Sequence, residues 1–330
     1  MLCRPDPARF STQLRSLDIR FRTYAATCPV PLPAPGLIVT PEIRRQSELY
    51  LPLSEIRDTF YLLYRCSLSY PPILTSTLFH TNHSWADLYA SLPHAFQDSA
   101  NPAALLRRLL DDPELLTTFL FESFLPGRFY GGFKRYPGQL ACIGEWVGER
   151  LGRPLRCLDA ACGTGEGSYD LAILLRDLHW RSELIQIEGW TVEPLEVWAA
   201  AHCRFPSDPD RETMYRSHTE TLFKSGISER ISFRSADLRD LPRSVRNNQF
   251  DLILCNGLLG GPIINRVEEM KLVVGNLAGL LSPGGVLLTA DSFHDGWKKK
   301  IPGDFLGDLF RGCGLNVQAA GEGLAARKLE

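Results

Sequence analysis

The sequence lacks any apolar run near the roughly 20 residues that a helix needs to cross a bilayer. Its N-terminus carries several arginines but no apolar core of the signal-peptide kind. Neither sign of charge is in excess, since 36 Lys and Arg stand against 38 Asp and Glu, a formal net charge of -2. So small a charge exerts no long-range attraction on nucleic acid or acidic membranes. We therefore expect a cytoplasmic protein without a nucleic-acid partner and without membrane insertion.

Metal-binding patterns are also missing. The nine cysteines form no C-x-x-C pair, and His80 and His83 have no Cys or third His at ligand spacing nearby. The sequence therefore predicts no metal site. Cys157, Cys162 and Cys255 lie in apolar, strand-like segments, which favours reduced, buried thiols.

The chain has 330 residues, 44% of them hydrophobic, which is enough for one large domain and an appendage. Residues 1–50 mix Pro, Arg and Ser and are predicted to form an irregular leader. Residues 51–150 repeat apolar side chains every three or four positions, which indicates a helical N-terminal domain. Within it, Asn101 followed by Pro102 predicts a helix start.

From residue 151 to residue 330 the pattern becomes α/β. Short apolar runs of strand length alternate with helix-length segments, which predicts parallel strands joined by helical crossovers. The tail from residue 314 predicts a closing hairpin. The expected fold is a mostly parallel, Rossmann-like sheet with a C-terminal antiparallel hairpin; its predicted parallel strands are residues 155–161, 184–193, 230–237, 250–257 and 284–292.

The first strand leads into a glycine-rich loop in CLDAACGTGEGSYDLA, residues 157–172. Gly163 and Gly165 lack a β-carbon, so another group can approach the backbone closely at the place where doubly wound sheets bind ligands. No G-K-[ST] follows, which excludes a P-loop. Asp159 and Glu166 would repel a pyrophosphate but attract a cation. S-adenosylmethionine, with its sulfonium and α-ammonium groups, is such a cation.

This loop resembles motif I of class I S-adenosylmethionine-dependent methyltransferases, and its C-G-T-G-E-x-x-Y-x-L-A form is similar to the chemoreceptor glutamate methyltransferase (CheR) family. Further matches follow in order through residues 150–330: an acid at the end of the second strand, Asp-Leu after the third, FDLILCNG as the fourth and LLSPGGVLLTADS leading into the fifth. The resemblance implies a class I methyltransferase sheet with S-adenosylmethionine as cofactor.

The resemblance also implies site residues. Glu193 would accept the ribose hydroxyls, Asp237 would bond the adenine amino group, and the backbone N–H of Leu238 would donate to the ring. Asn256 would face the reaction centre as a cofactor-binding and catalytic residue. The loop itself would contribute Asp159, Ala161, Gly163, Thr164, Gly165 and Glu166. Each position also has a structural explanation: a tight turn, a first-turn acid, or, for Glu193 before Pro194, a helix cap.

One more candidate precedes the sheet. In the family, an arginine in an F-x-R-x segment lies over the cofactor pocket beside the substrate carboxylate. Here FKRY, residues 133–136, supplies Arg135, whose guanidinium matches a carboxylate in bidentate geometry. The alternative is that this segment is a basic surface loop.

The acceptor is less constrained. A carboxylate is anionic and needs no general base, whereas a phenol, alcohol or ammonium would need one; Tyr130, Tyr136 and His294 are candidates without an assigned role. Two features depart from the family: CNGLLGGP places Gly261 near a family tyrosine, and residues 201–230 are expected to be helical rather than a small β-subdomain.

We therefore predict S-adenosylmethionine-dependent O-methyl transfer to a carboxylate or other oxygen acceptor on a protein or small molecule. The alternatives are a small-molecule O- or N-methyltransferase and a non-catalytic S-adenosylmethionine-binding module.

Overall fold

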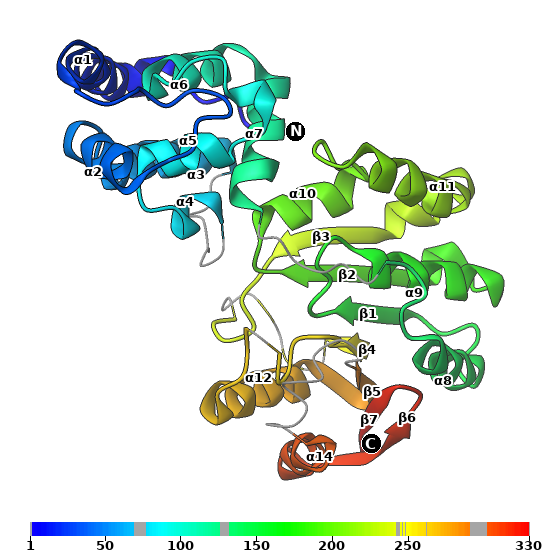
Figure 1. Cartoon of the computed structure of the whole chain (residues 1–330). Helices are drawn as coiled ribbons and strands as arrows, with labels where there is room; N and C mark the ends of the chain where they lie inside the picture. Colours follow the sequence, from blue (N-terminus) through cyan, green and yellow to red (C-terminus); the bar gives the residue numbers. More distant parts are fainter. Residues whose placement is uncertain are drawn as a thin grey trace. The chain divides into compact units, whose positions relative to one another are not determined.

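The structure is a computed structural model, and the chain forms two compact units (Figure 1). One unit comprises Met1–Phe129 with Phe205–Glu212, and the other comprises Tyr130–Arg204 with Thr213–Glu330. The residues that the structure describes are 2–68, 77–125, 132–241, 245, 247, 249–261, 263–290 and 302–329.

The first unit is helical, and it includes much of the segment predicted to be irregular. That prediction is wrong for α1 and α2, because the prolines of residues 29–35 lie between these helices and do not interrupt them. Thr40 caps α2, its side chain accepting the N–H of Ile43 at 3.3 Å, with Pro41 in the first turn. The elements are η1 (Pro7–Phe10), α1 (Ser11–Thr27), α2 (Pro41–Tyr50), α3 (Leu53–Leu68), α4 (Leu78–Thr81), α5 (Trp85–Ser91), η2 (His94–Phe96), α6 (Pro102–Asp111) and α7 (Pro113–Phe124).

Aromatic side chains fill the core of this unit. Phe60 and Phe119 have ring centroids 5.4 Å apart, and the rings of Phe79 and Phe124 stack at 4.9 Å. All four side chains are fully buried. The predicted helix start is confirmed, since Asn101 accepts the N–H of Ala103 at 2.9 Å at the beginning of α6.

The second unit is built on a seven-stranded sheet in the order β3-β2-β1-β4-β5-β7-β6. The first five strands of this order are parallel, and β7 runs antiparallel to both β5 and β6. The predicted mostly parallel, Rossmann-like sheet with a C-terminal hairpin is therefore confirmed. The strands are β1 (Leu155–Asp159), β2 (Ile185–Thr191), β3 (Ile231–Ser235), β4 (Phe250–Leu254), β5 (Leu281–Ala290), β6 (Leu315–Ala320) and β7 (Gly323–Lys328).

Helices cover this sheet: α9 contacts β1 and β2, α10 contacts β3, and α14 contacts β6 (Figure 1). Helix α8 clusters with the sheet, so the second unit begins earlier than the predicted border at residue 150. The helical expectation for residues 201–230 holds for α11. The elements are α8 (Pro137–Gly148), α9 (Glu166–Asp177), η3 (Ser182–Leu184), α10 (Pro194–His202), α11 (Pro209–Ser225), η4 (Ile227–Arg230), α12 (Val267–Leu280) and α14 (Gly303–Gly312).

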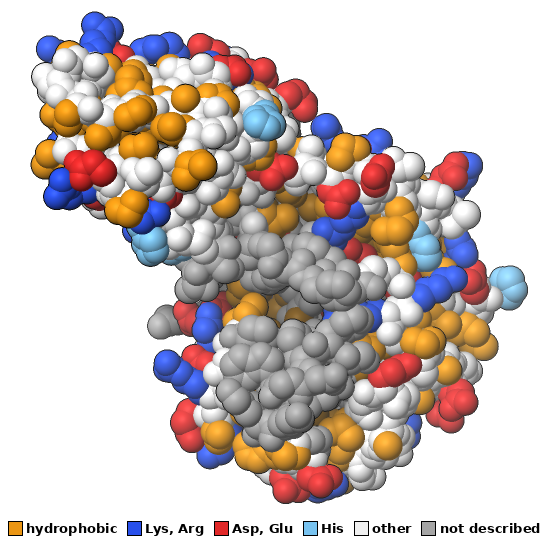
Figure 2. All heavy atoms as spheres, in the orientation of Figure 1, with side chains coloured by type: hydrophobic (Ala, Val, Ile, Leu, Met, Phe, Trp, Pro, Cys, Tyr) orange, Lys and Arg blue, Asp and Glu red, His pale blue; other side chains and the backbone are white. Residues whose placement is uncertain are grey.

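The buried cysteines and the mixed surface charges match what the sequence predicts. Cys157, Cys162 and Cys255 are buried free thiols, as predicted. On the face that Figure 2 shows, Lys and Arg side chains are interspersed with Asp and Glu. Among the described residues, no helix is long and apolar enough to span a membrane.

Candidate functional site

The carboxyl ends of β1, β2, β3 and β4 lie side by side, because these strands are neighbours and parallel. Asp159 ends β1, and Glu193, Asp237 and Asn256 each come two residues after β2, β3 and β4. The connections diverge between β1 and β4, where open α/β sheets bind their ligands. The fold therefore brings four predicted site residues to one edge of the sheet.

The two loop glycines occupy different surroundings. Both have positive φ, 53° at Gly163 and 93° at Gly165, where a side chain would be strained. A β-carbon on Gly163 would meet no atom within 4 Å, so this backbone is open to a ligand. A β-carbon on Gly165 would lie 2.9 Å from the ring of Phe233 and 3.0 Å from the β-carbon of Ala200. Gly165 therefore serves the packing of the protein itself.

Asp159 lies beneath the loop and is 4% exposed. Its Oδ2 accepts the hydroxyl of Ser168 at 2.8 Å, and the backbone N–H of Ala161 also donates to this carboxyl. Burial, with a smaller contribution from the charges of Glu166 and Asp170, raises the pKa of Asp159 to about 6, although these two hydrogen bonds act to lower it. A buried carboxyl of this kind is more easily ionised when a cation binds beside it.

Thr164 and Glu166 form the turn into α9. The hydroxyl of Thr164 donates to Oε2 of Glu166 at 2.7 Å, and Thr164 is fully buried. The carbonyl of Thr164 accepts the phenol O–H of Tyr215 from α11 at 2.5 Å. The glycine loop is thus hydrogen-bonded to α11, a helix to which the sequence assigned no role at the site.

Glu193 follows β2 and is fully buried. Its Oε1 accepts the N–H of Leu195 at 3.2 Å, so it caps α10, the structural role left open by the sequence. The neighbouring Glu196 accepts the hydroxyl of Thr191 at 2.5 Å. Contact between Glu193 and a ribose stays a prediction.

After β3, Asp237 is engaged with a residue that the sequence analysis missed. Arg239 donates to Oδ2 of Asp237 through Nη2 at 2.7 Å and to Oδ1 through Nε at 3.0 Å. These bonds lower the pKa of Asp237. The sequence did contain a sign of this pair, because Asp237 and Arg239 are opposite charges two residues apart at the end of a predicted strand. The Leu238 side chain is 4% exposed in the core, and its carbonyl accepts a bond from Asn276 at 2.7 Å.

After β4, Asn256 is also engaged, with Gln139 of α8. The two side-chain amides exchange hydrogen bonds of 2.8 Å and 3.0 Å. No local motif marks Gln139, because its partner lies 117 residues away. Further along, a β-carbon on Gly261 would lie 2.9 Å from the carbonyl of Gly257. This turn therefore excludes the side chain expected there from the family pattern.

Arg135 lies in residues 132–136, ahead of α8. Its guanidinium carbon is 5.2 Å from the centroid of the Tyr136 ring. Tyr136 is 7% exposed. The other two base candidates, Tyr130 and His294, lie outside the described residues.

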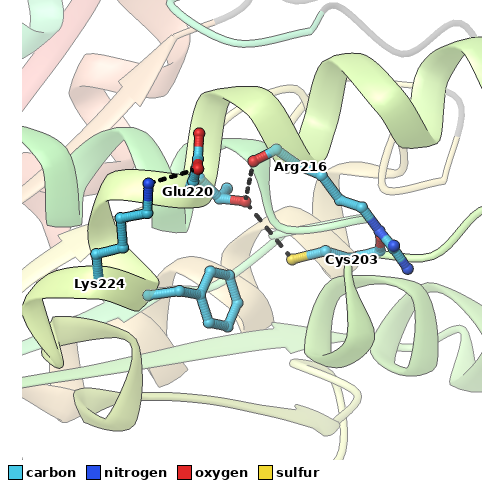
Figure 3. Close-up of a pocket in the computed structure, with 6 residues that line it drawn as sticks. Cys203, Arg216, Glu220 and Lys224 are labelled. Carbon is cyan, nitrogen blue, oxygen red and sulfur yellow. Dashed lines mark hydrogen bonds and ion pairs between the residues drawn. The ribbon is translucent and has the colours of Figure 1, made fainter.

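A hollow of about 430 Å³ lies elsewhere in this unit, on α11 (Figure 3). Lys224 forms an ion pair with Glu220 of 2.6 Å at this hollow. None of its lining residues was predicted from the sequence: Cys203, Arg216, Thr219, Glu220, Phe223 and Lys224. The described residues include no cluster of three or more His, Cys, Asp or Glu that could hold a metal ion.

The parallel sheet with its reversed hairpin, a glycine loop after β1 and acids after β1, β2 and β3 define the class I methyltransferase fold. The residues present fit S-adenosylmethionine: open backbone at Gly163, and the acids Asp159 and Glu166 for a cation.

Residues 143–294 match the family model described as CheR methyltransferase, SAM binding domain. This segment is therefore similar to the S-adenosylmethionine-binding domain of CheR methyltransferases, and the predicted methyltransferase class and cofactor are confirmed for it.

The chain is also similar to a relative described as probable biofilm formation methyltransferase WspC of Pseudomonas putida. The two are 27% identical over 168 residues, which cover 47% of this chain and 39% of the relative. The chain thus spans about two fifths of that relative.

Two solved structures illustrate the likeness of part of the chain to known folds. The [4+2]-cyclase SpnF is 23% identical with a TM-score of 0.36, covering 54% of this chain and 58% of the other. A geranyl diphosphate methyltransferase is 15% identical with a TM-score of 0.34, covering 54% and 61%. At these TM-scores the matches carry no functional argument.

Proposed function

We propose that this protein is an S-adenosylmethionine-dependent methyltransferase whose acceptor is an oxygen, with a carboxylate on a protein or small molecule as the first choice. The observation that carries this proposal is the convergence of Asp159, Glu193, Asp237 and Asn256 at one sheet edge beside an open glycine backbone. The CheR-type domain match over residues 143–294 supports it.

The cofactor would be held by charge and by shape. Asp159 and Glu166 supply negative charge near the loop, where the ammonium and sulfonium groups would lie. Glu193 would accept the ribose hydroxyls, since a carboxylate has two acceptor oxygens. Asp237 would reach the adenine amino group, for which it must share or exchange its bonds with Arg239.

The cofactor supplies a methyl group already activated by its sulfonium leaving group. Transfer to an acceptor oxygen would break the carbon–sulfur bond of the bound cofactor, and the sulfur would keep the electron pair. A carboxylate acceptor becomes a neutral ester and releases no proton. The protein's main task is then alignment and exclusion of water, with Arg135 and Asn256 orienting the acceptor.

Binding and transfer can be measured separately. Isothermal titration with S-adenosylmethionine tests the cofactor site, and incubation with its tritiated methyl form tests transfer to protein and small-acid acceptors. Esters made on carboxylates release volatile tritiated methanol in alkali, whereas N-methyl and ether products do not. Binding with alkali-labile product supports the carboxylate acceptor, and alkali-stable product rules out the carboxylate and points to the small-molecule O- or N-methyltransferase.

Binding without transfer to any acceptor would instead support the non-catalytic module. A matched control is Arg181→Ala, which removes an exposed ion pair with Glu183 in η3 and leaves the sheet edge untouched. This variant should match the wild type in both measurements.

A further inference from the structure

The segment that carries Arg135 has a strained backbone. Lys134 has φ 54°, a left-handed conformation that non-glycine residues rarely adopt, and Gly132 has φ 71°. Such a conformation persists only where surrounding contacts hold it. Here the N–H of Lys134 donates to Oδ2 of Asp170 at 2.5 Å. Asp170 lies one turn into α9 and is 7% exposed, so the contact is shielded from water.

The same carboxyl is also bound from α11. His218 lies 3.2 Å from Asp170, measured from Nε2 to Oδ1. Both oxygens of Asp170 are thus engaged, one with residue 134 and one with His218. Asp170 therefore links the Arg135 segment to two helices that are far apart in the sequence.

Ring stacking adds a second link. The ring of Phe133 stacks on His218, with centroids 3.8 Å apart and planes at 26°. Phe133 also meets Tyr215 edge-on at 4.9 Å. Tyr215 in turn donates its hydroxyl to the carbonyl of Thr164 in the glycine loop. The contacts of α11 therefore join the Arg135 segment to the cofactor loop.

Helix α11 is itself fixed on the end of α10. Figure 3 shows Arg216 and Cys203 close together there. The Thr219 hydroxyl lies 3.9 Å from the Cys203 sulfur and donates to the Tyr215 carbonyl of its own helix at 3.0 Å. Arg216 Nε also donates to the Cys203 carbonyl at 3.2 Å. A helix anchored in this way can hold Phe133 in one place.

We infer that Asp170 and His218 are positioning residues for methyl transfer: they hold residues 132–136 in a strained conformation and thereby fix Arg135 relative to the glycine loop. Neither residue needs to contact the cofactor or the acceptor. This inference rests on the proposed function, because Arg135 acts there as the acceptor-orienting group.

The first test does not depend on activity. Trypsin cleaves after Lys134 and Arg135 only if this segment leaves its fixed conformation. Asp170→Ala and His218→Ala should be cut there about tenfold faster than the wild type, and the amide of Lys134 should exchange hydrogen faster by a similar factor. The control Glu220→Gln changes an exposed residue of the same helix and should behave as the wild type.

The second test measures transfer. His218→Ala should lower kcat by about tenfold with the Kd for S-adenosylmethionine within about twofold of wild type. His218→Phe keeps the stacking ring and should recover part of the loss. Combined with Arg135→Ala, His218→Ala should cause no further loss, because both act through one guanidinium.

The outcomes separate the two proposals. Unchanged cleavage and exchange in both alanine variants would overturn the positioning role, whatever the activity. Faster cleavage with unchanged kcat would also overturn it. A wild type without methyl transfer would contradict the proposed function, and the cleavage and exchange results would then still report whether Asp170 and His218 fix the segment.

Discussion

The side-chain amides of Gln139 and Asn256 donate a hydrogen bond to each other, and Oδ1 of Asn256 also accepts the N–H of Ala290 at 2.8 Å. Both acceptor positions of this oxygen are therefore used, while one of the two hydrogens of the amide nitrogen has no partner among the residues that the structure describes. Asn256 can thus donate one bond to a bound acceptor but cannot receive a proton from it. This favours an acceptor that presents an oxygen lone pair, such as a carboxylate.

Breaking this pair should separate stability from activity. Gln139→Leu removes both hydrogen bonds between the two amides, at a position where Gln139 is buried. It should therefore lower the free energy of unfolding by about 1–3 kcal/mol. Adding Asn256→Leu removes the other amide but also takes the acceptor away from the N–H of Ala290, so stability should recover little, and methyl transfer should stay low. Denaturant unfolding and the tritium assay measure the two effects. Full activity in the double variant would remove Asn256 from the acceptor site.

Glu193 is both a helix cap and the expected ribose ligand, and two substitutions distinguish these roles. Glu193→Gln keeps an oxygen for the N–H of Leu195, so stability should change little while the Kd for S-adenosylmethionine rises by about tenfold or more. Glu193→Ala should in addition lose about 1 kcal/mol of stability with the cap. Titration calorimetry and thermal unfolding give the two readings. An unchanged Kd in Glu193→Gln would rule out the ribose contact and leave helix capping as the role of Glu193.

The loop glycines should respond differently to a single methyl group. Gly163→Ala places its β-carbon in open space, so the cost is backbone strain of about 1 kcal/mol, and the main effect should be weaker cofactor binding. Gly165→Ala drives the β-carbon into Phe233 and Ala200 and should destabilise the fold itself by more. Phe233→Leu should rescue part of the Gly165→Ala defect. Equal loss of stability at both glycines would contradict this assignment.

Cofactor affinity should depend on pH through Asp159. Because its folded-state pKa is raised from 3.8 to about 6, the folded chain binds more protons than the unfolded chain in that interval. The free energy of unfolding therefore falls as pH rises through it. A bound cation favours the ionised carboxyl, so affinity should rise about tenfold between pH 5 and pH 7, with proton release.

Calorimetry in buffers of different ionisation enthalpy measures that proton release. Asp159→Asn should flatten the pH dependence, whereas Ser168→Ala, which removes a bond to the ionised form, should move it to higher pH. The charges of Glu166 and Asp170 raise the pKa of Asp159, and they remain in the Ser168→Ala variant as in the wild type. A slope that survives in Asp159→Asn would assign the titration to another group.

Local patterns predicted the sheet well. Parallel direction follows from the alternation of apolar runs with helices, and the closing hairpin was predicted from the tail that begins at residue 314, whereas the strand order was not predicted. The resemblance to class I methyltransferases pointed to Asp159, Glu193, Asp237 and Asn256, because the family motifs place each of them at or just after the end of a strand. The prediction of an irregular leader over residues 1–50 was wrong for α1 and α2, because the prolines of residues 29–35 lie between these helices and Pro41 starts α2 rather than breaking it.

The partners of these residues could not be predicted in the same way. Gln139 pairs with Asn256 across 117 positions, and Asp170 meets Lys134 across 36. Nothing local in the sequence encodes such distances; they result from how α8, α9 and α11 pack on the sheet. The Asp237–Arg239 pair did have a local signal, in the two-residue spacing of opposite charges.

The tip of the β6–β7 hairpin reaches the first turn of α8. Glu322 accepts the N–H groups of Gly138 and Gln139, each at 2.8 Å, from 184 and 183 positions away. A loop of that length must close before this cap can form, and long-range closure is slow. During refolding the amide pair of Gln139 should therefore reach its native arrangement late, so binding competence should lag behind the recovery of secondary structure.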